Sequence, residues 1–253
     1  MHIKYIFKLL FLVFIVSCNK THKLTKIKAE RLEINETLSK NATVENFIKP
    51  YRANVNKNLD SIISFALDTY SKTDGDYNTA IGNLMADAVF TESDPIFYLR
   101  TGQHLDFALL NHGGIRAPIS KGAIRIRTAF EIMPFENSVV IVALKGEQII
   151  KMTEYLSQYG KAHPISNQFQ LILNADSTIY SATVNGNNID ESKIYYVATN
   201  DYLYNGGNQM TFFHPNDGLY VLDYKIRNVL IDYFKKNDTI NPKRDNRFIM
   251  KTK

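Results

Sequence analysis

Leu109-Leu-Asn-His-Gly-Gly-Ile-Arg116, followed by Met133-Pro-Phe-Glu-Asn137, lies at the centre of the chain and decides its fold. The apolar run 105–110, which Asp106 interrupts, is typical of a short buried strand. Two glycines directly after this strand let the backbone turn sharply and bring its amide groups close to a ligand. Arg116 follows the turn, where its planar guanidinium offers forked hydrogen-bond donors. The same pattern also fits a tight turn with a surface arginine.

A second strand-and-turn unit lies later in the chain. The β-rich run 194–199 leads into the turn Asn205-Gly-Gly-Asn208, so a glycine pair again follows a strand. Three segments thus occur in order: Asn111-His-Gly-Gly-Ile-Arg116, Pro134-Phe-Glu-Asn137 and Ala198-Thr-Asn-Asp-Tyr-Leu-Tyr-Asn-Gly-Gly207. They resemble the Asn-Gly-Gly-Gly-Ile-Arg, Pro-Phe-x-Asn and Thr-Asn-x-Phe-x-x-x-Gly-Gly-Asp motifs in the C-terminal domain of bacterial and animal 5'-nucleotidases. The resemblance covers roughly Asn54 to the C-terminus.

The order of the expected elements predicts the fold class. Strands and helices alternate without strict βαβ regularity, which favours an α+β fold in which helices flank a mixed β-sheet; the resemblance implies the same fold. The expected strands are 62–67, 105–110, 139–144, 169–173, 179–184 and 194–199, and the expected helices are 43–59, 79–90, 146–160 and 222–234. Pro50 is expected to kink or divide the first of these helices. Asn185-Gly186 is typical of a turn.

The resemblance implies a pocket for a base and its sugar. Phe135 and Tyr202 match the family's two stacking aromatics, although an aromatic beside a strand end is commonly part of the core. Asn111 and Asn137 would read the base edge or the sugar, because an amide both donates and accepts; turn and cap roles are the alternative. Arg116 would bind the sugar or a phosphate-side oxygen, unless it forms a surface ion pair. The complete expected set of substrate-binding residues is Asn111, Gly113, Gly114, Arg116, Phe135, Asn137, Tyr202, Gly206, Gly207 and Asn208.

Three departures from the family pattern affect the expected pocket. Asn208 stands where the family has an aspartate. A carboxylate accepts hydrogen bonds from ribose hydroxyls worth about 1.5–3 kcal/mol each, whereas a hydrogen bond to a neutral acceptor is worth about 0.5–1.5 kcal/mol. Weaker ribonucleoside binding or a different preferred ligand is therefore expected. His112 replaces a glycine and adds a titratable ring to the turn. Tyr77 and Asn83 stand near positions from which the family often supplies an arginine to the ligand.

In the two-domain members of the family, the chemistry lies in an N-terminal calcineurin-like metallophosphatase domain with two metal ions. Its Asp-x-His, Gly-Asn-His-Asp/Glu and Gly-His-x-His motifs do not occur in this sequence. The six histidines are scattered without the spacing of metal ligands: His2, His22, His104, His112, His163 and His214. We therefore expect no catalytic or metal-binding residue in this chain, and divalent metals on a partner.

The N-terminal residues 1–17 are expected to be a lipoprotein signal peptide, since a short basic start precedes an apolar block too short to span a bilayer. Ile15-Val-Ser-Cys18 is similar to the lipobox of bacterial lipoproteins, in which the cysteine is lipidated; an ordinary signal peptide with a chance cysteine is the alternative. Cys18 is the only cysteine, so no internal disulfide forms. Residues 18–42 are predicted to be a tether with a short helix over 29–38, and residues 43–253 to be the 5'-nucleotidase C-terminal-like domain.

The leading hypothesis is a nucleotide- or nucleoside-recognising domain that acts as the substrate-binding half of a 5'-nucleotidase with a separate metallophosphatase chain. A free-standing nucleoside- or nucleotide-binding lipoprotein without a catalytic role is the alternative, and a degenerate structural relic is a third possibility. The net charge of +5 includes no dense basic stripe, which argues against nucleic acid as a partner. Asn19 after the cysteine favours, by family analogy, the periplasmic side of a bacterial outer membrane.

Overall fold

The computed structural model describes residues 23–251, so the expected signal peptide (residues 1–17) and lipidation site Cys18 lie outside the described residues. The chain divides into two units, residues 1–48 and 49–253. In the first unit, residues 23–41 contain no helix or strand, and the helix expected over 29–38 is replaced by a single turn at 36–38. Leu32 and Ile34 are 84% and 92% exposed. That prediction was wrong because a short helix without a packed apolar face is marginal in water.

Helix α2 (Ala42–Leu59) matches the helix expected over 43–59, and Pro50 lies inside it without dividing it. None of its residues is buried. Near the C-terminal end of this helix, Arg127 donates to Asn56 Oδ1 at 3.0 Å and, just beyond the helix, to Asp60 Oδ1 at 2.9 Å. No helix within residues 23–251 reaches the length and hydropathy that a membrane span requires.

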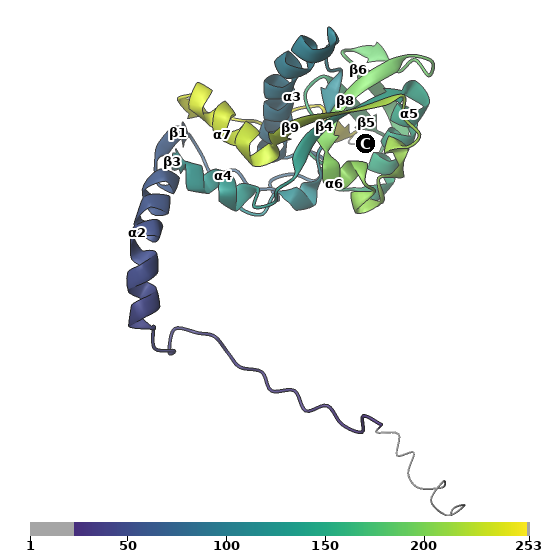
Figure 1. The fold of residues 1–253 in the computed structure, drawn as a ribbon. Helices are drawn as coiled ribbons and strands as arrows, with labels where there is room; N and C mark the ends of the chain where they lie inside the picture. Colours follow the sequence, from purple (N-terminus) through teal and green to yellow (C-terminus); the bar gives the residue numbers. More distant parts are fainter. Residues whose placement is uncertain (1–22, 252–253) are drawn as a thin grey trace, which may run out of the picture. The chain divides into compact units, whose positions relative to one another are not determined.

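The second unit contains three sheets flanked by helices, which confirms the expected α+β fold (Figure 1). In the central sheet, ordered β2-β8-β4-β9, β2 is parallel to β8 while β4 is antiparallel to both of its neighbours. The other sheets have the orders β11-β5-β6-β7 and β10-β1-β3. The strands are β1 (Ile62–Ala66), β2 (Phe107–Ala108), β3 (Gly122–Arg125), β4 (Ser138–Lys145), β5 (Phe169–Leu173), β6 (Ile179–Val184), β7 (Asn187–Asn188), β8 (Ile194–Asn200), β9 (Gly218–Lys225), β10 (Thr239–Ile240) and β11 (Phe248–Met250).

The expected helices of this unit are present, but two of them have different ends. Helix α3 continues to Thr101 and includes Pro95, whereas the sequence predicts an end at residue 90. The helix expected over 222–234 begins only at Ile226, because the preceding residues belong to β9, where Val221 pairs with Val140 of β4. The helices are α3 (Ala80–Thr101), α4 (Ile126–Ile132), α5 (Gly146–Tyr159), α6 (Asp201–Tyr204) and α7 (Ile226–Lys236), with 3-10 turns η1 (His112–Gly114), η2 (Gly207–Gln209) and η3 (Thr211–Phe213).

Strand β4 is apolar along most of its length because both faces of the central sheet are covered. Ile141 packs in a core with residues of α3 and α7. Its neighbours Val140 and Val142 pack in a second core with residues of α5. Successive side chains of a strand point to opposite faces, so a strand covered on both faces needs a continuous apolar run. Figure 1 shows α3 and α7 to one side of this sheet and α5 to the other.

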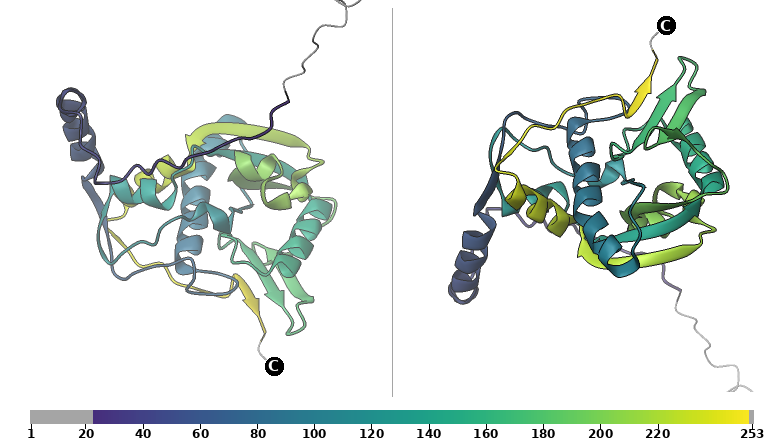
Figure 2. Two further views of the ribbon diagram at one scale, coloured as in Figure 1. Left: turned by 90° about the horizontal axis from the view of Figure 1, so that it is seen from below. Right: turned by 90° about the horizontal axis from the view of Figure 1, so that it is seen from above.

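The hairpin of β5 and β6 confirms the expected pairing of residues 169–173 with 179–184. Asn185 and Gly186 have φ values of 51° and 75° and form the turn from β6 into β7. The C-terminal strand β11 pairs with β5, so this hairpin and the end of the described chain lie side by side in both views of Figure 2.

Three connecting segments meet at one end of the strands of the central sheet. Ala108, in β2, is paired with Ala198 of β8, and Val139, at the start of β4, is paired with Asn200 at the end of β8. The segments that follow β2, follow β8 and precede β4 therefore meet at this end.

Candidate functional site

A cavity of about 310 Å³ lies where these three segments meet. Its volume is at the lower end of the range, about 300–1,000 Å³, of small-molecule sites. The lining residues are Asn111, Gly113, Arg116, Phe135, Asn137, Tyr202 and Asn208. The structure thus brings seven of the ten expected residues around one cavity. Gly114, Gly206 and Gly207 lie in the same turns without lining it.

The first wall is the turn η1. The Gly114 N–H donates to Asn111 O at 3.0 Å. A Cβ on Gly114 would lie 3.1 Å from Met133 Cε and 3.2 Å from Asn111 Oδ1, so a side chain here would require these neighbours to shift by a few tenths of an ångström. A Cβ on Gly113 would contact Asn111 Nδ2 at 3.7 Å, which is an ordinary distance. Packing within the described chain therefore does not require glycine at position 113, and its missing side chain leaves room in the cavity.

This first turn is supported from behind by His163, which sequence reasoning did not identify. The His112 N–H donates to Nδ1 of His163 at 3.3 Å, and His112 Nε2 lies 3.1 Å from Lys72 O. Lys72 Nζ in turn donates to Ile115 O at 2.9 Å. His163 is 2% exposed, and this burial lowers its pKa to about 4. The imidazole is therefore neutral at neutral pH, and its Nδ1 serves as an acceptor.

The second wall carries Phe135 and is anchored by the start of α7. The Ile226 N–H donates to Asn137 O at 3.0 Å. The Arg227 guanidinium donates to the Glu136 carboxylate, and this bond holds the pKa of Glu136 below its usual value. Glu136 and Asn137 directly follow Phe135 in the sequence, so the start of α7 holds the backbone beside this residue in place.

The third wall follows β8 and carries Tyr202 and Asn208. Gly206 has a φ of 87°, in the left-handed region that favours glycine. A Cβ on Gly207 would lie 2.5 Å from a ring carbon of Tyr202, so the ring packs directly over this glycine. Tyr155 of α5 donates its hydroxyl to Asn208 O at 2.8 Å. Gly206 and Gly207 therefore shape this wall, and Tyr155 supports it.

The two aromatic side chains of the cavity are Phe135 and Tyr202. They are 40% and 46% exposed, so neither belongs to the core. The Cζ atom of Arg116 lies 5.6 Å from the centre of the Phe135 ring, a cation–π distance. Among the seven lining residues, Arg116 alone carries a full charge. The cavity therefore combines accessible ring faces with a preference for an anionic group.

The residues near the family's arginine positions have structural contacts instead. The Tyr77 ring centre lies 5.1 Å from that of Phe248. Asn83 is 2% exposed and donates to Asn78 Oδ1 and to Lys243 O, both at 3.0 Å. Neither Tyr77 nor Asn83 lines the cavity, so Arg116 provides its positive charge.

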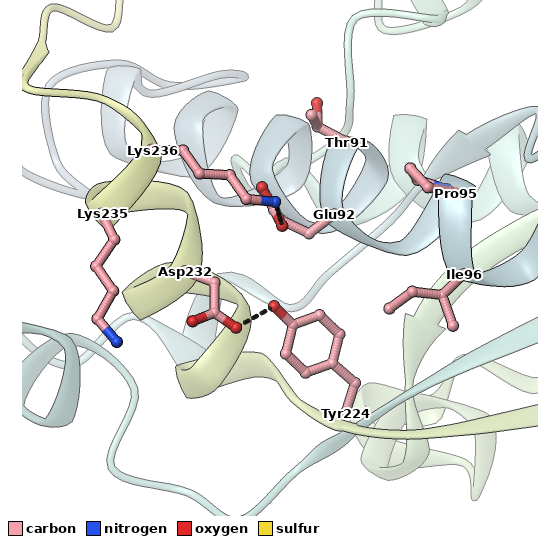
Figure 3. Close-up of a pocket in the computed structure, with 8 residues that line it drawn as sticks. All are labelled: Thr91, Glu92, Pro95, Ile96, Tyr224, Asp232, Lys235 and Lys236. Atoms are coloured by element: carbon pink, nitrogen blue, oxygen red, sulfur yellow. Dashed lines mark hydrogen bonds and ion pairs between the residues drawn. The ribbon is translucent and has the colours of Figure 1, made fainter.

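A larger cavity of about 490 Å³ lies between α3 and α7 (Figure 3). Its two carboxylates interact with the protein's own side chains: Lys236 Nζ lies 2.5 Å from Glu92 Oε2, and Tyr224 donates to Asp232 Oδ2 at 2.7 Å. None of the expected binding residues lines this cavity. We therefore place the candidate site at the end of the central sheet where the three segments meet.

Within residues 23–251, no group of three or more His, Cys, Asp and Glu side chains is arranged to hold a metal ion. A two-metal phosphatase centre needs several such ligands for each ion. The donors of this part of the chain do not fit the metal pair of the two-domain family members. The residues that line the cavity offer aromatic faces, amides and one guanidinium for binding a ligand.

Comparison with known proteins identifies related chains. Residues 58–215 match the family model described as "5'-nucleotidase, C-terminal domain". The chain is 24% identical over 225 residues to Protein UshA of Escherichia coli (strain K12), an alignment that covers 85% of this chain and 38% of UshA. It is 30% identical over 165 residues to the trifunctional nucleotide phosphoesterase protein YfkN of Bacillus subtilis (strain 168), covering 58% of this chain and 11% of YfkN.

A solved structure shares the fold. The crystal structure of a 5'-nucleotidase precursor from Thermus thermophilus superimposes with a TM-score of 0.68 at 21% identity, covering 82% of this chain and 43% of that chain. This chain thus spans less than half the length of these relatives.

Proposed function

Because the chain belongs to the family of 5'-nucleotidase C-terminal domains, we propose that it recognises a nucleotide or nucleoside as the substrate-binding half of a split 5'-nucleotidase. A separate metallophosphatase chain supplies the divalent metals and hydrolyses the phosphoester. The observation that carries the proposal is the cavity of about 310 Å³ in which residues from Asn111 to Asn208 come together.

The aromatic side chains suit a flat base. Phe135 and Tyr202 line one cavity and keep much of their ring surface exposed. A base inserted there covers both rings, and each base–aromatic stack contributes about 1–3 kcal/mol in nucleic-acid binding sites. The Tyr202 hydroxyl stays at the rim, where water or the ligand can satisfy it.

The polar groups suit the rest of a nucleotide. Arg116 carries the charge of the cavity, and its forked donors match a phosphate or a sugar oxygen. Asn111 and Asn137 present amides to the base edge or the sugar. Asn208 contacts the sugar with a neutral amide, so its bonds to the hydroxyls are weaker than those of a carboxylate. The binding energy therefore comes mainly from stacking and from Arg116.

In this proposal the chain binds and orients the substrate, and the hydrolytic step takes place on the partner. A stable complex of the two chains needs an interface of roughly 1,200 Å² or more in total.

Isothermal titration calorimetry with AMP, adenosine and UDP-glucose tests ligand recognition. We expect AMP or adenosine to bind, and the substitution Phe135→Ala to weaken binding about fivefold to 150-fold, the factor that corresponds to one lost stack. Tyr98→Ala is the matched control, since Tyr98 is 50% exposed on α3 and does not line the cavity. Equal affinities of wild type and F135A, with the fold intact, would show that the cavity is not the binding site.

Hydrolysis of AMP by mixtures with a metallophosphatase tests the partner. The first candidate is a metallophosphatase encoded by a neighbouring reading frame. We expect a complex on size-exclusion chromatography and a faster rate than the partner shows alone. Nucleotide binding without any rate gain would favour the alternative, a free-standing nucleotide-binding lipoprotein with no catalytic role. Neither binding nor rate gain would indicate a structural relic.

We also propose that the protein is anchored by a lipid on Cys18 at the periplasmic face of the outer membrane. The sequence Ile15-Val-Ser-Cys18 supports the lipid anchor, because a multiply acylated terminus holds firmly to a membrane. Asn19 after the cysteine supports the outer membrane by analogy with bacterial lipoproteins. Separation of inner and outer membranes from cells that produce the protein, followed by immunoblotting, tests the location.

A further inference from the structure

We propose that Asn200 sets the orientation of the Asn111 side-chain amide, so that the cavity presents an N–H donor and selects bases with a hydrogen-bond acceptor at that point. The ligand part of this inference rests on the proposed function, whereas the orientation of the amide does not. Asn200 does not line the cavity, so it is a positioning residue.

The first link is the start of helix α6. Asn200 is 0% exposed and is the N-cap of this helix. Its Oδ1 accepts the Leu203 N–H at 2.8 Å. A backbone N–H donates and never accepts, so the Asn200 atom that faces it is the oxygen. The orientation of the Asn200 amide follows from this contact.

The second link joins Asn200 to the cavity. Asn200 Nδ2 lies 3.0 Å from Asn111 Oδ1, a buried contact. An amide nitrogen donates, so the Asn111 atom that receives this bond is its oxygen. Asn111 Nδ2 has no hydrogen-bond partner within residues 23–251, and Asn111 lines the cavity. Its free N–H groups lie beside Gly113, where no side chain intervenes.

The N–H donor of Asn111 limits which bases can form a hydrogen bond with the cavity wall. A donor in the wall pairs with an unprotonated ring nitrogen or a carbonyl oxygen of the base, and it leaves a base N–H group unpaired. Adenine and hypoxanthine have opposite hydrogen-bonding groups at two neighbouring positions. Adenine has an acceptor at N1 and a donor at N6, whereas hypoxanthine has a donor at N1–H and an acceptor at O6. AMP and IMP should therefore differ in affinity by about twofold to tenfold, the worth of one neutral hydrogen bond.

The substitution Asn200→Ser tests the positioning role. Serine caps a helix about as well as asparagine, so α6 keeps its acceptor, but the shorter side chain does not reach Asn111. The freed amide can then present either end, and the AMP-to-IMP affinity ratio should move toward one. Thr79→Ser is the matched control: Thr79 is 1% exposed, caps α3 by accepting the Gly82 N–H at 3.1 Å, and does not line the cavity. An unchanged ratio in N200S would overturn the proposal.

A measurement without ligand separates this inference from the proposed function. Hydrogen exchange of the side-chain amides, followed by ¹⁵N NMR, should be slow at Asn200 Nδ2 and fast at Asn111 Nδ2 in the wild-type protein. The reverse pattern, with Asn111 protected, would overturn the assigned orientation. If no nucleotide binds to the wild type, the proposed function fails, and the exchange pattern still decides the orientation of the amide.

Discussion

Because His163 is buried beside the candidate site, we predict that the protein loses stability in mild acid. The side chain is 2% exposed, and its Nδ1 accepts the His112 N–H at 3.3 Å. Burial lowers its pKa to about 4, from 6.5. Protonation would remove the acceptor and place a charge in the core, so the folded protein resists it until the pH approaches 4.

The unfolded chain binds this proton near pH 6.5, whereas the folded protein binds it near pH 4. Between these values the unfolded state carries more protons, so the free energy of unfolding falls as the pH is lowered. Across the full pH range between the two pKa values, the free energy of unfolding falls by about 3 kcal/mol because of His163. About 2 kcal/mol of this loss occurs between pH 7 and pH 5. Three carboxylates have lowered pKa values, and their contributions to the free energy of unfolding are lost at a lower pH than that of His163: Asp60, Glu136 and Asp245.

Urea unfolding of the wild type and of His163→Asn at pH 7, 6 and 5, followed by circular dichroism, measures this effect. Asparagine keeps an acceptor near the position of Nδ1 but does not titrate, so H163N should lose most of the pH dependence. His163→Gln removes the proton site as well but places its oxygen farther out, so it should flatten the pH dependence while costing more stability at pH 7. A wild-type protein equally stable at pH 7 and 5, or an H163N variant that declines in parallel with it, would refute the reasoning.

Two further changes test the third wall and the anchor. Gly207→Ala should displace the Tyr202 ring, because the new Cβ would lie 2.5 Å from a ring carbon; we expect a loss of about 1–3 kcal/mol in urea unfolding together with weaker adenosine binding, and unchanged stability would contradict this packing. Cys18→Ala should abolish metabolic labelling with palmitate and move the protein from the membrane to the soluble fraction, whereas continued membrane association would exclude Cys18 as the anchor.

The sequence predicts the buried strands well because their patterns are local. The apolar run 139–144 is readable as a strand, and β4 contains it. Strand β9 shows the limit of this reasoning. Residues 222–225 were expected to begin a helix, but they extend a strand because they lie beside β4, and Ser138 pairs with Lys225. That pairing depends on residues far away in the chain, which no local pattern contains.

The same distinction separates the residues around the cavity from those that support them. Motif order and strand ends indicated Asn111, Phe135 and Tyr202, because glycine turns after strands are visible in the sequence. The supporting contacts join residues far apart: 89 positions between Asn111 and Asn200, and 53 between Tyr155 and Asn208. Tyr155 does not stand out by type or spacing, and although Asn200 belongs to the third motif, its bond to Asn111 emerges only from the folded arrangement.

The two aromatic walls are anchored on opposite faces of the central sheet. The turn of Phe135 is tied to α7 through Glu136 and Arg227, and α7 packs in the core on one face. The turn of Tyr202 is tied to α5 through the Tyr155 hydroxyl, and α5 packs in the core on the other face. Contacts to helices on both faces of the sheet therefore hold the two aromatic segments of the cavity without a ligand. A ligand that enters a preordered cavity loses less free energy to ordering of the protein, which favours binding by a small cavity.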